Sequence, residues 1–381
     1  MTEIKPLSDI RVLDLTTLLP GPLATLFLAE AGADVLKIEP PGGDDMRRFP
    51  PIQGGVSAAY SLLNRGKRSL TLDLKSDTGK DALATLIRDA DVLVEQFRPG
   101  VLHRLGFGRD RLADLNPKLI VCSITGYGQD GPRRDEPGHD LNYMAASGLL
   151  AVSPGSPDAP VVPPALIADI AGGSFPAVIN ILLALRQRDR TGEGCRIDIA
   201  MTDALFTLAF WGYAQLQLSG AAPAPGCELL SGGSPRYRLY PASDGALIAV
   251  GALEQKFWNR FCELIDLPEA LREDAVDPEA TEAAVAALLT AKSSGHWAGV
   301  FDGQDCCANV VRTLDQAVGD PHFAGRGLFA GTVEGAGRTL GALPVPISPA
   351  LGGRGDIARA APIEPDMLSG PLDGWPQRID G

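Results

Sequence analysis

Residues 10–39, IRVLDLTTLLPGPLATLFLAEAGADVLKIE, decide the fold class. Two short, mostly apolar runs at 10–15 and 35–39 enclose a longer apolar stretch at 23–31, which Gly32 stops. Short apolar runs bounded by turn residues are typical of buried strands, whereas a longer run followed by glycine is typical of a helix. The stretch therefore predicts a strand, a helix and a second strand in succession.

The same alternation continues along the chain. Strand-like runs occur at 69–74, 92–95 and 119–124, and a helix is expected at 77–88. Strands that alternate with helices favour a doubly wound, mostly parallel α/β sheet, so this part of the chain is expected to be Rossmann-like. Pro20-Gly21-Pro22 stands where a dinucleotide-binding chain has its glycine-rich turn. We therefore expect no dinucleotide site.

The second half of the sequence changes in texture. A long apolar helix is expected from Ala171, and the stretch AAPAPG at 221–226 has the composition of a linker. The segments beyond it mix strand-like and helix-like patterns. We predict a large Rossmann-like domain at 1–200, a linker helix and linker at 201–226, a smaller α+β domain at 227–325, and a segment at 326–381 that returns to the large domain.

Composition narrows the function classes. A chain of 381 residues is long enough for two domains, and its 34 basic against 47 acidic residues give a net charge of −13, which disfavours nucleic-acid binding. The sequence shows no basic start followed by an apolar run and no apolar stretch long enough to cross a membrane, so we expect neither a secretory signal nor a membrane span. Its six cysteines are scattered without metal-binding spacing. We expect a cytoplasmic protein with reduced thiols and no metal.

Basic residues gather in three places, at 37–48, 64–68 and 98–104. Loops at the carboxyl ends of parallel strands meet at one edge of a sheet, where ligands bind, and arginine and lysine suit a ligand with several phosphates. The alternative for any one of them is a solvated surface charge. The candidate phosphate-binding residues are Lys37, Arg65, Lys67, Arg98 and Arg104.

Acid–base chemistry has its candidates in two further segments. His139 and Asp140 stand in the turn PGHDLNY at 137–143, at the head of an apolar helical run, and Asp169 stands among apolar residues just before the long helix. Considered singly, each carboxylate is most often a helix cap and a lone histidine is most often structural. A carboxylate in an apolar setting can alternatively serve as a nucleophile or a general base.

Several motifs together resemble those of one family. They are LSDIRVLDL at 7–15, AGADVLKIEPPG at 31–42, NRGKRS at 64–69, FRPG at 97–100, TGYG at 125–128 and GALE at 251–254. In this order they are similar to the family of class III CoA-transferases and α-methylacyl-CoA racemases, the CaiB/BaiF superfamily, over nearly the whole chain. The resemblance implies an interlocked homodimer, each chain with a Rossmann-like large domain and a small domain. It also implies that coenzyme A lies along the basic loops, with Arg65, Arg98 and Arg104 near its phosphates or adenine.

The resemblance also implies roles for the acid–base candidates. In the transferases, an Asp at the position of Asp169 attacks the thioester and forms an anhydride and then a thioester with coenzyme A. In the racemases, that Asp and a His at position 139 are the two acid/base groups, and a Glu at position 254 orients the His. The turn Gly138-His139-Asp140 is similar to the racemase pattern.

The sequence therefore predicts a racemase or epimerase that acts on 2-methylacyl-CoA thioesters through an enolate. It has His139, Asp169, Glu254 and Asp140 at its site and needs no cofactor beyond the coenzyme A of its substrate. A CoA-transferase with Asp169 as nucleophile is the first alternative, and a non-catalytic acyl-CoA-binding protein is the second. Two positions depart from the family pattern: Gln255 replaces the usual Pro, and SPALGG at 348–353 replaces a Ser-Gly-Thr-Pro turn.

Overall fold

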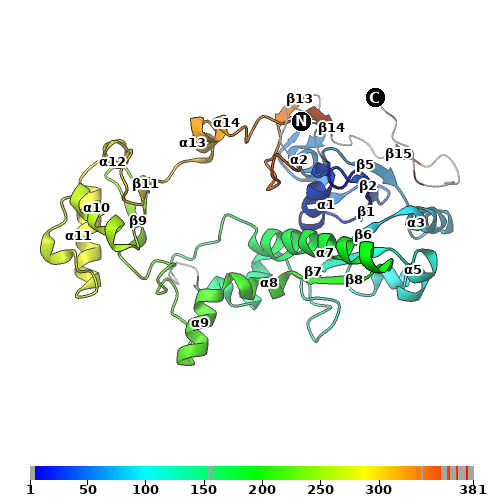
Figure 1. The fold of residues 1–381 in the computed structure, drawn as a ribbon, viewed down its shortest axis with the longest axis horizontal. Helices are drawn as coiled ribbons and strands as arrows, with labels where there is room; N and C mark the ends of the chain where they lie inside the picture. Colours follow the sequence, from blue (N-terminus) through cyan, green and yellow to red (C-terminus); the bar gives the residue numbers. More distant parts are fainter. Residues whose placement is uncertain are drawn as a thin grey trace. The chain divides into compact units, whose positions relative to one another are not determined.

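A parallel sheet forms the centre of the larger of two structural units (Figure 1). The computed structural model describes residues 5–152, 155, 158–335, 338–352, 358–360, 366–367 and 375. The larger unit comprises 1–147, 164–207 and 320–381, and the smaller unit comprises 148–163 and 208–319. The predicted boundaries lie at 200, 226 and 325, whereas this division changes unit at 147, 163, 207 and 319. The segment 148–163, which the sequence assigned to the large domain, falls in the smaller unit.

Within the described residues, the central sheet has seven strands in the order β15-β5-β2-β1-β6-β7-β8. All neighbours run parallel, so the predicted doubly wound α/β class is confirmed. The strands are β1 Arg11–Leu15, β2 Asp34–Glu39, β5 Arg68–Thr71, β6 Val92–Glu95, β7 Ile120–Thr125, β8 Arg196–Ala200 and β15 Asp366–Met367. The strand order reverses direction between β1 and β6, and the crevice at the carboxyl ends of such a pair is the usual ligand site of this fold class.

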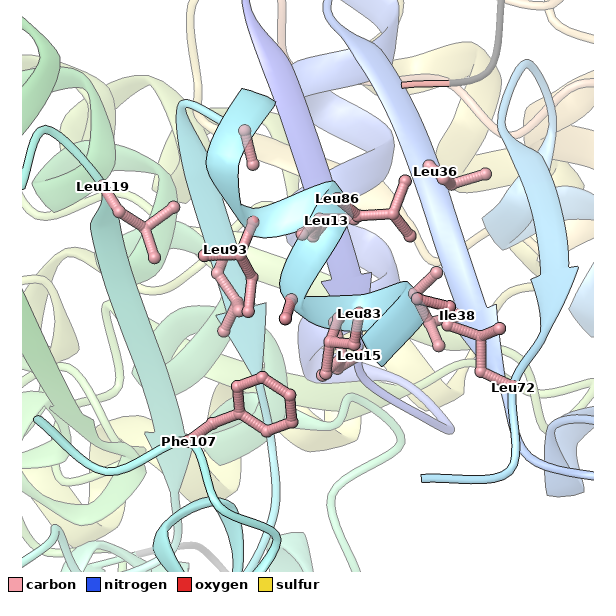
Figure 2. Packing of buried hydrophobic residues seen from close by; sticks show 14 of the residues in the cluster. Leu13, Leu15, Leu36, Ile38, Leu72, Leu83, Leu86, Leu93, Phe107 and Leu119 are labelled. Atoms are coloured by element: carbon pink, nitrogen blue, oxygen red, sulfur yellow. The ribbon is translucent and has the colours of Figure 1, made fainter. Parts of the chain in front are cut away.

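One face of the sheet carries the main hydrophobic core. On β1, Leu13 and Leu15 point to this face and Asp14 to the opposite face, because side chains alternate along a strand. Leu83 and Leu86 of α3 lie over these strands with no exposed surface (Figure 2). Each fully buried leucine contributes about 1.5–3 kcal/mol to folding. The cluster also takes in Leu36, Ile38, Leu93 and Phe107.

The long helix predicted after Ala171 lies against α1, β7 and β8. Together with the turn before it, this helix covers Ala168–Thr191, and by length and composition alone that stretch could cross a membrane. Helices that cover the core of soluble proteins pass the same test. Its apolar side chains at 175, 179, 182 and 183 are exposed.

The larger unit contains these further elements within the described residues. The helices are α1 Pro20–Glu30, α2 Ala58–Asn64, α3 Asp77–Asp89, α4 Val101–Arg104, α5 Arg109–Leu115, α6 Asp140–Ala146, α7 Phe175–Thr191, α8 Met201–Leu208 and α14 Pro321–Gly325, with a 3-10 turn η1 at Asp45–Arg48 and a π turn η3 at Ala168–Ser174. Small sheets pair β3 Ile52–Gln53 with β4 Val56–Ser57, and β12 Thr332–Gly335 with β13 Arg338–Gly341 and β14 Ala358–Ala360.

The smaller unit is built on a three-stranded antiparallel sheet in the order β11-β10-β9. Trp258 and Phe261 of α10 are fully buried against this sheet. Its elements are η2 Leu149–Val152, α9 Phe210–Ser219, β9 Tyr237–Pro241, β10 Leu247–Gly251, α10 Gln255–Leu264, η4 Glu269–Leu271, α11 Pro278–Thr290, α12 Ser294–Phe301, β11 Ala308–Val310 and α13 Leu314–Val318.

The predicted segment 326–381 falls partly outside the described residues. Those left out are 336–337, 353–357, 361–365, 368–374 and 376–381. The described part from Asp320 onward belongs to the larger unit.

Candidate active site

The loops that follow β1 and β6 meet at the point where the strand order reverses. The backbone N–H of Gly21, in the first turn of α1, donates to the side-chain carbonyl of Gln96 at 3.1 Å. Gly21 also lies tightly against Thr16, since a Cβ on it would come within 2.3 Å of that side chain. The Pro20-Gly21-Pro22 turn is therefore closely packed against the loops at the carboxyl edge of the sheet.

Asp169 belongs to a π-helical turn that packs against the start of α1. Ala168–Ser174 forms the turn and runs directly into α7, so the helical run starts before Ala171, where the sequence placed it, and Asp169 lies inside the run. π turns insert one extra residue into a helix and are frequent at functional sites. The hydroxyl of Ser174 donates to the carbonyl of Pro20 at 2.8 Å and so ties the turn to the start of α1.

Two glycines let the turn approach its neighbours. A Cβ on Gly172 would lie 2.3 Å from the carbonyl oxygen of Met201, and one on Gly173 would lie 3.0 Å from Pro20. The first of these distances is shorter than any van der Waals contact. The turn that carries Asp169 can therefore pack this closely against Met201 and Pro20 only because residues 172 and 173 have no side chain.

The His139 turn lies next to this turn. His139 is the residue before α6, its side chain is exposed, and its backbone N–H donates to the side-chain oxygen of Asn142 at 3.1 Å. Asp140 is buried, and its Oδ1 atom accepts the backbone N–H of Asp169 at 2.9 Å. Asp140 thus joins the two predicted acid/base segments.

The surroundings of Asp169 favour its neutral form. Burial raises the pKa of this carboxyl to about 6, the negative charge of Asp140 adds to the rise, and His139 opposes it. A carboxyl group with such a pKa exists in both protonation states near neutral pH, so it can give or take a proton there.

Tyr143 holds the His139 turn to the loop after β7. Its hydroxyl donates to the carbonyl of Gly138 at 2.6 Å, and its ring meets Tyr127 edge-on at 5.4 Å. A Cβ on Gly126 would lie 2.3 Å from the ring. Burial raises the pKa of Tyr143 to about 12, Asp169 adds to the rise, and Arg98 opposes it. The sequence analysis missed Tyr143, whose only signal is the pair of glycines that make room for its ring.

Arg98 and Arg104, both exposed, are the two predicted phosphate contacts that face solvent. Gly100 between them has a positive φ of 79°, which brings the chain round tightly. A Cβ on Gly100 would lie 3.2 Å from an Arg104 nitrogen and 3.9 Å from an Arg134 nitrogen. Arg134, which the sequence analysis did not single out, therefore joins this basic group, here called the Gly100 cluster (Arg98, Arg104 and Arg134).

The other three predicted phosphate contacts have internal partners instead. The Nζ atom of Lys37 lies 2.9 Å from the Asp44 carboxylate, and that of Lys67 lies 3.1 Å from the Asp14 carboxylate, with both lysine side chains fully buried. The Nε atom of Arg65, also buried, donates to the Glu30 carboxylate at 2.8 Å. These charges are engaged by carboxylates inside the protein, and phosphate binding by Lys37, Arg65 and Lys67 stays a prediction.

Glu254 belongs to the smaller unit, where it is the residue before α10, and its side chain is exposed. The structure thus brings together His139, Asp140 and Asp169 within the larger unit and holds Glu254 in the other. Over the residues that the structure describes, no group of three or more His, Cys, Asp or Glu side chains is arranged to hold a metal ion.

Comparison with known proteins identifies the family. Residues 7–364 match the family described as CoA-transferase family III. The chain belongs to CoA-transferase family III. The family resemblance read from the motifs is therefore confirmed, and with it an enzyme class that acts on acyl-CoA substrates.

Relatives within CoA-transferase family III carry more than one activity. The chain is 35% identical to the human alpha-methylacyl-CoA racemase over 333 residues, which is 86% of this chain and 83% of the relative. It is 34% identical to the acetyl-CoA:oxalate CoA-transferase of Acetobacter aceti over 361 residues, 90% of this chain and 89% of the relative. A solved CAIB/BAIF family protein from Brucella suis superimposes with a TM-score of 0.77 at 29% identity, over 90% of this chain and 92% of that one.

Proposed function

We propose that this protein is a racemase or epimerase of 2-methylacyl-CoA thioesters. The observation that carries the proposal is that the His139 turn lies next to Asp169, whose pKa of about 6 results from burial and the neighbouring Asp140 and is opposed by His139. Inversion of an α-carbon requires one group that removes a proton from one face and another that delivers a proton to the other. A histidine beside a carboxyl that exchanges protons near neutrality supplies both.

In the proposed mechanism one of the two groups takes the α-proton. The electron pair of the broken C–H bond moves toward the thioester carbonyl, which becomes an enolate. The other group then protonates the α-carbon from the opposite face, and the enolate collapses back to the thioester. His139 and Asp169 exchange roles between the two directions of the reaction. Asp140 holds the backbone of Asp169 and keeps its pKa raised, and the family resemblance assigns the orientation of His139 to Glu254.

Binding of the coenzyme A part is assigned to the Gly100 cluster. Arg98 belongs to the loop that follows the carboxyl end of β6, and guanidinium groups suit phosphate oxygens. No cofactor beyond coenzyme A enters the proposal. A homodimer fits the apolar stripe on α7, where Phe175, Ile179 and Leu183 are 38%, 57% and 63% exposed, because a second copy would remove these side chains from water.

A CoA-transferase is the second candidate, with Asp169 as the nucleophile. It is favoured by the similarity to the Acetobacter aceti transferase, which extends over 90% of this chain. Burial that raises the pKa of a carboxylate also makes its ionised form a stronger nucleophile, so the same environment serves this chemistry.

Incubation with a single enantiomer of a 2-methylacyl-CoA in heavy water tests the proposal. Deuterium at C2 and loss of optical purity without any acceptor acid are expected, and Asp169→Ala should abolish both. Transfer of coenzyme A to an added carboxylic acid, with Asp169 trapped by hydroxylamine or borohydride and located by mass spectrometry, would establish the transferase instead. Tight binding with neither reaction would leave the non-catalytic acyl-CoA-binding protein.

A further inference from the structure

In the smaller unit, the start of α10 is hydrogen-bonded by Arg236, the residue just before β9. The Nη1 atom of Arg236 donates to the backbone carbonyl of Leu253 at 3.2 Å, and its Nη2 atom donates to the side-chain carbonyl of Gln255 at 3.0 Å. One guanidinium group therefore binds both neighbours of Glu254 in the chain. This arrangement is here called the Arg236 clamp (Arg236, Leu253, Gln255 and Asp274).

The guanidinium group is itself held in place. Its Nε and Nη2 atoms both donate to the carboxylate of Asp274, at 3.0 Å and 2.6 Å. It also lies 5.1 Å from the ring centre of the fully buried Trp258, within the range of a cation–π contact. The side chains of Arg236 and Asp274 are only 15% and 13% exposed. A planar fork fixed on three sides is a rigid support, which a lysine ammonium group would not reproduce.

Glu254 is fixed through its backbone while its carboxylate stays available. Its carbonyl accepts the backbone N–H groups of Phe257 and Trp258, each at 3.0 Å, and its φ and ψ are −72° and 140°. A residue before a helix commonly bonds its side chain to the first turn. The Glu254 carboxylate makes no such bond, and no ion pair involving it occurs among the described residues.

We propose that Arg236 is a positioning residue for Glu254, and that it takes over the restraint that a proline at position 255 would provide. The inference rests on the proposed role of Glu254 in the reaction. Proline at the first position of a helix confines the preceding residue to an extended conformation, which is the conformation Glu254 has. Gln255 lacks that restraint, and its side chain is bound by Arg236 and donates to Asn259 at 2.8 Å. In this proposal the hydrogen bonds of Arg236 to Leu253 and Gln255 supply the backbone restraint that a proline ring would supply.

The test uses Arg236→Met, which keeps most of the hydrophobic stem and removes the fork, and Gln255→Ala, which leaves the Arg236–Asp274 pair intact. Arg236→Met is expected to lower kcat at least tenfold with KM changed less than twofold. Hydrogen exchange at the Phe257 and Trp258 amides is expected to rise by a similar factor. Gln255→Ala is expected to change both in the same direction and to a smaller extent. Arg260→Met is the matched control, because Arg260 lies on α10 and binds Gln304 and Glu263 instead of the residues beside Glu254.

Rescue separates positioning from general damage. In the double variant Arg236→Met with Gln255→Pro, the ring restrains Glu254 again, so kcat and amide exchange should return to within about threefold of the unsubstituted protein. Loss of kcat that proline does not restore would overturn the inference. The inference would also be overturned if Glu254→Gln lowered kcat but Arg236→Met changed neither kcat nor amide exchange. If Glu254→Gln keeps full turnover while Arg236→Met still raises exchange and proline lowers it, the positioning holds and the proposed role of Glu254 fails.

Discussion

The backbone N–H of Asp169 donates to the carboxylate of Asp140 at 2.9 Å, across 29 positions of the chain. One buried acid therefore sets both the place of the proposed catalytic carboxyl and, through its charge, the ease with which that carboxyl ionises. The two effects can be separated experimentally, because asparagine retains an acceptor oxygen without the charge.

Asp140→Asn is expected to keep the Asp169 turn in place and to lower the Asp169 pKa, since a like charge has been removed. The acidic limb of the pH–rate profile should then move to lower pH, while Asp140→Ala, which also removes the acceptor, should lose most turnover. Rates of α-proton exchange between pH 5 and pH 9 measure both. An unmoved profile in Asp140→Asn would show that the Asp140 charge does not act on the reacting group.

Asp169→Asn is expected to stabilise the protein at pH 8 and to have little effect on stability at pH 4. The pKa of Asp169 is raised on folding from 3.8 to about 6, so its ionisation costs folding free energy as the pH rises through that interval. Two pKa units correspond to about 3 kcal/mol, and partial solvent access reduces the expected gain to about 1–2 kcal/mol. Urea unfolding at both pH values is the measurement, with the exposed Asp114→Asn as the control that should change neither.

Arg98→Ala and Arg104→Ala are expected to weaken binding of a CoA thioester. Hydrogen bonds to charged groups contribute roughly 1.5–3 kcal/mol each, so Kd should rise by about tenfold or more, most strongly at low salt. Titration calorimetry at two ionic strengths, with the exposed Arg111→Ala as control, measures the effect. Equal affinities in all three variants would assign Arg98 and Arg104 to the solvated surface.

Lys67→Met is expected to reduce stability and to leave the CoA-thioester affinity of the folded protein unchanged. The substitution removes one of the two ammonium groups that stabilise the buried Asp14 carboxylate, and because Lys37 remains, the loss should lie below the value of about 3–5 kcal/mol expected for a buried charge left without a partner. Adding Asp14→Asn should recover part of that loss. A variant that folds as stably as the original but binds the ligand weakly would return Lys67 to the binding site.

Glu254→Gln is expected to lower turnover strongly with little change in CoA-thioester binding. The substitution keeps the size of the side chain and removes the negative charge to which the family resemblance assigns the orientation of His139. The basic limb of the pH–rate profile should move to lower pH for the same reason. Full turnover with an unmoved profile would leave His139 to be oriented by Asp140 or by the backbone.

The fold was predictable because most strands of the central sheet, such as β6 and β7, are buried on both faces. The runs 92–95 (VLVE) and 119–124 (LIVCSI) are mostly apolar, and the structure has strands at 92–95 and 120–125. The helix start was predicted less well at Asp169, because the π turn depends on the Met201 carbonyl and Pro20, which are distant in the sequence. Local patterns carry no information about such contacts.

The segments that carry the acid–base candidates could be read from the sequence, whereas the internal partners of the basic candidates could not. His139, Asp140 and Asp169 came from short motifs, and they lie together. The carboxylate partners of Lys37 and Lys67 were not predicted, because a single sequence does not show which acid a lysine will meet inside the fold. Arg134 and Tyr143 were missed because their roles follow from Gly100, Gly126 and Gly138, whose importance lies in the side chains they lack.

The glycines beneath Asp169 have a consequence for anyone who wishes to change the acyl group that this protein accepts. Because a single methyl group at 172 would collide with the carbonyl of Met201, a mutant library that includes 172–174 would consist mainly of displaced or unfolded members. Diversity is better placed on exposed side chains around the site, where a new shape costs little stability. The chemistry and the choice of substrate can then be engineered as separate parts.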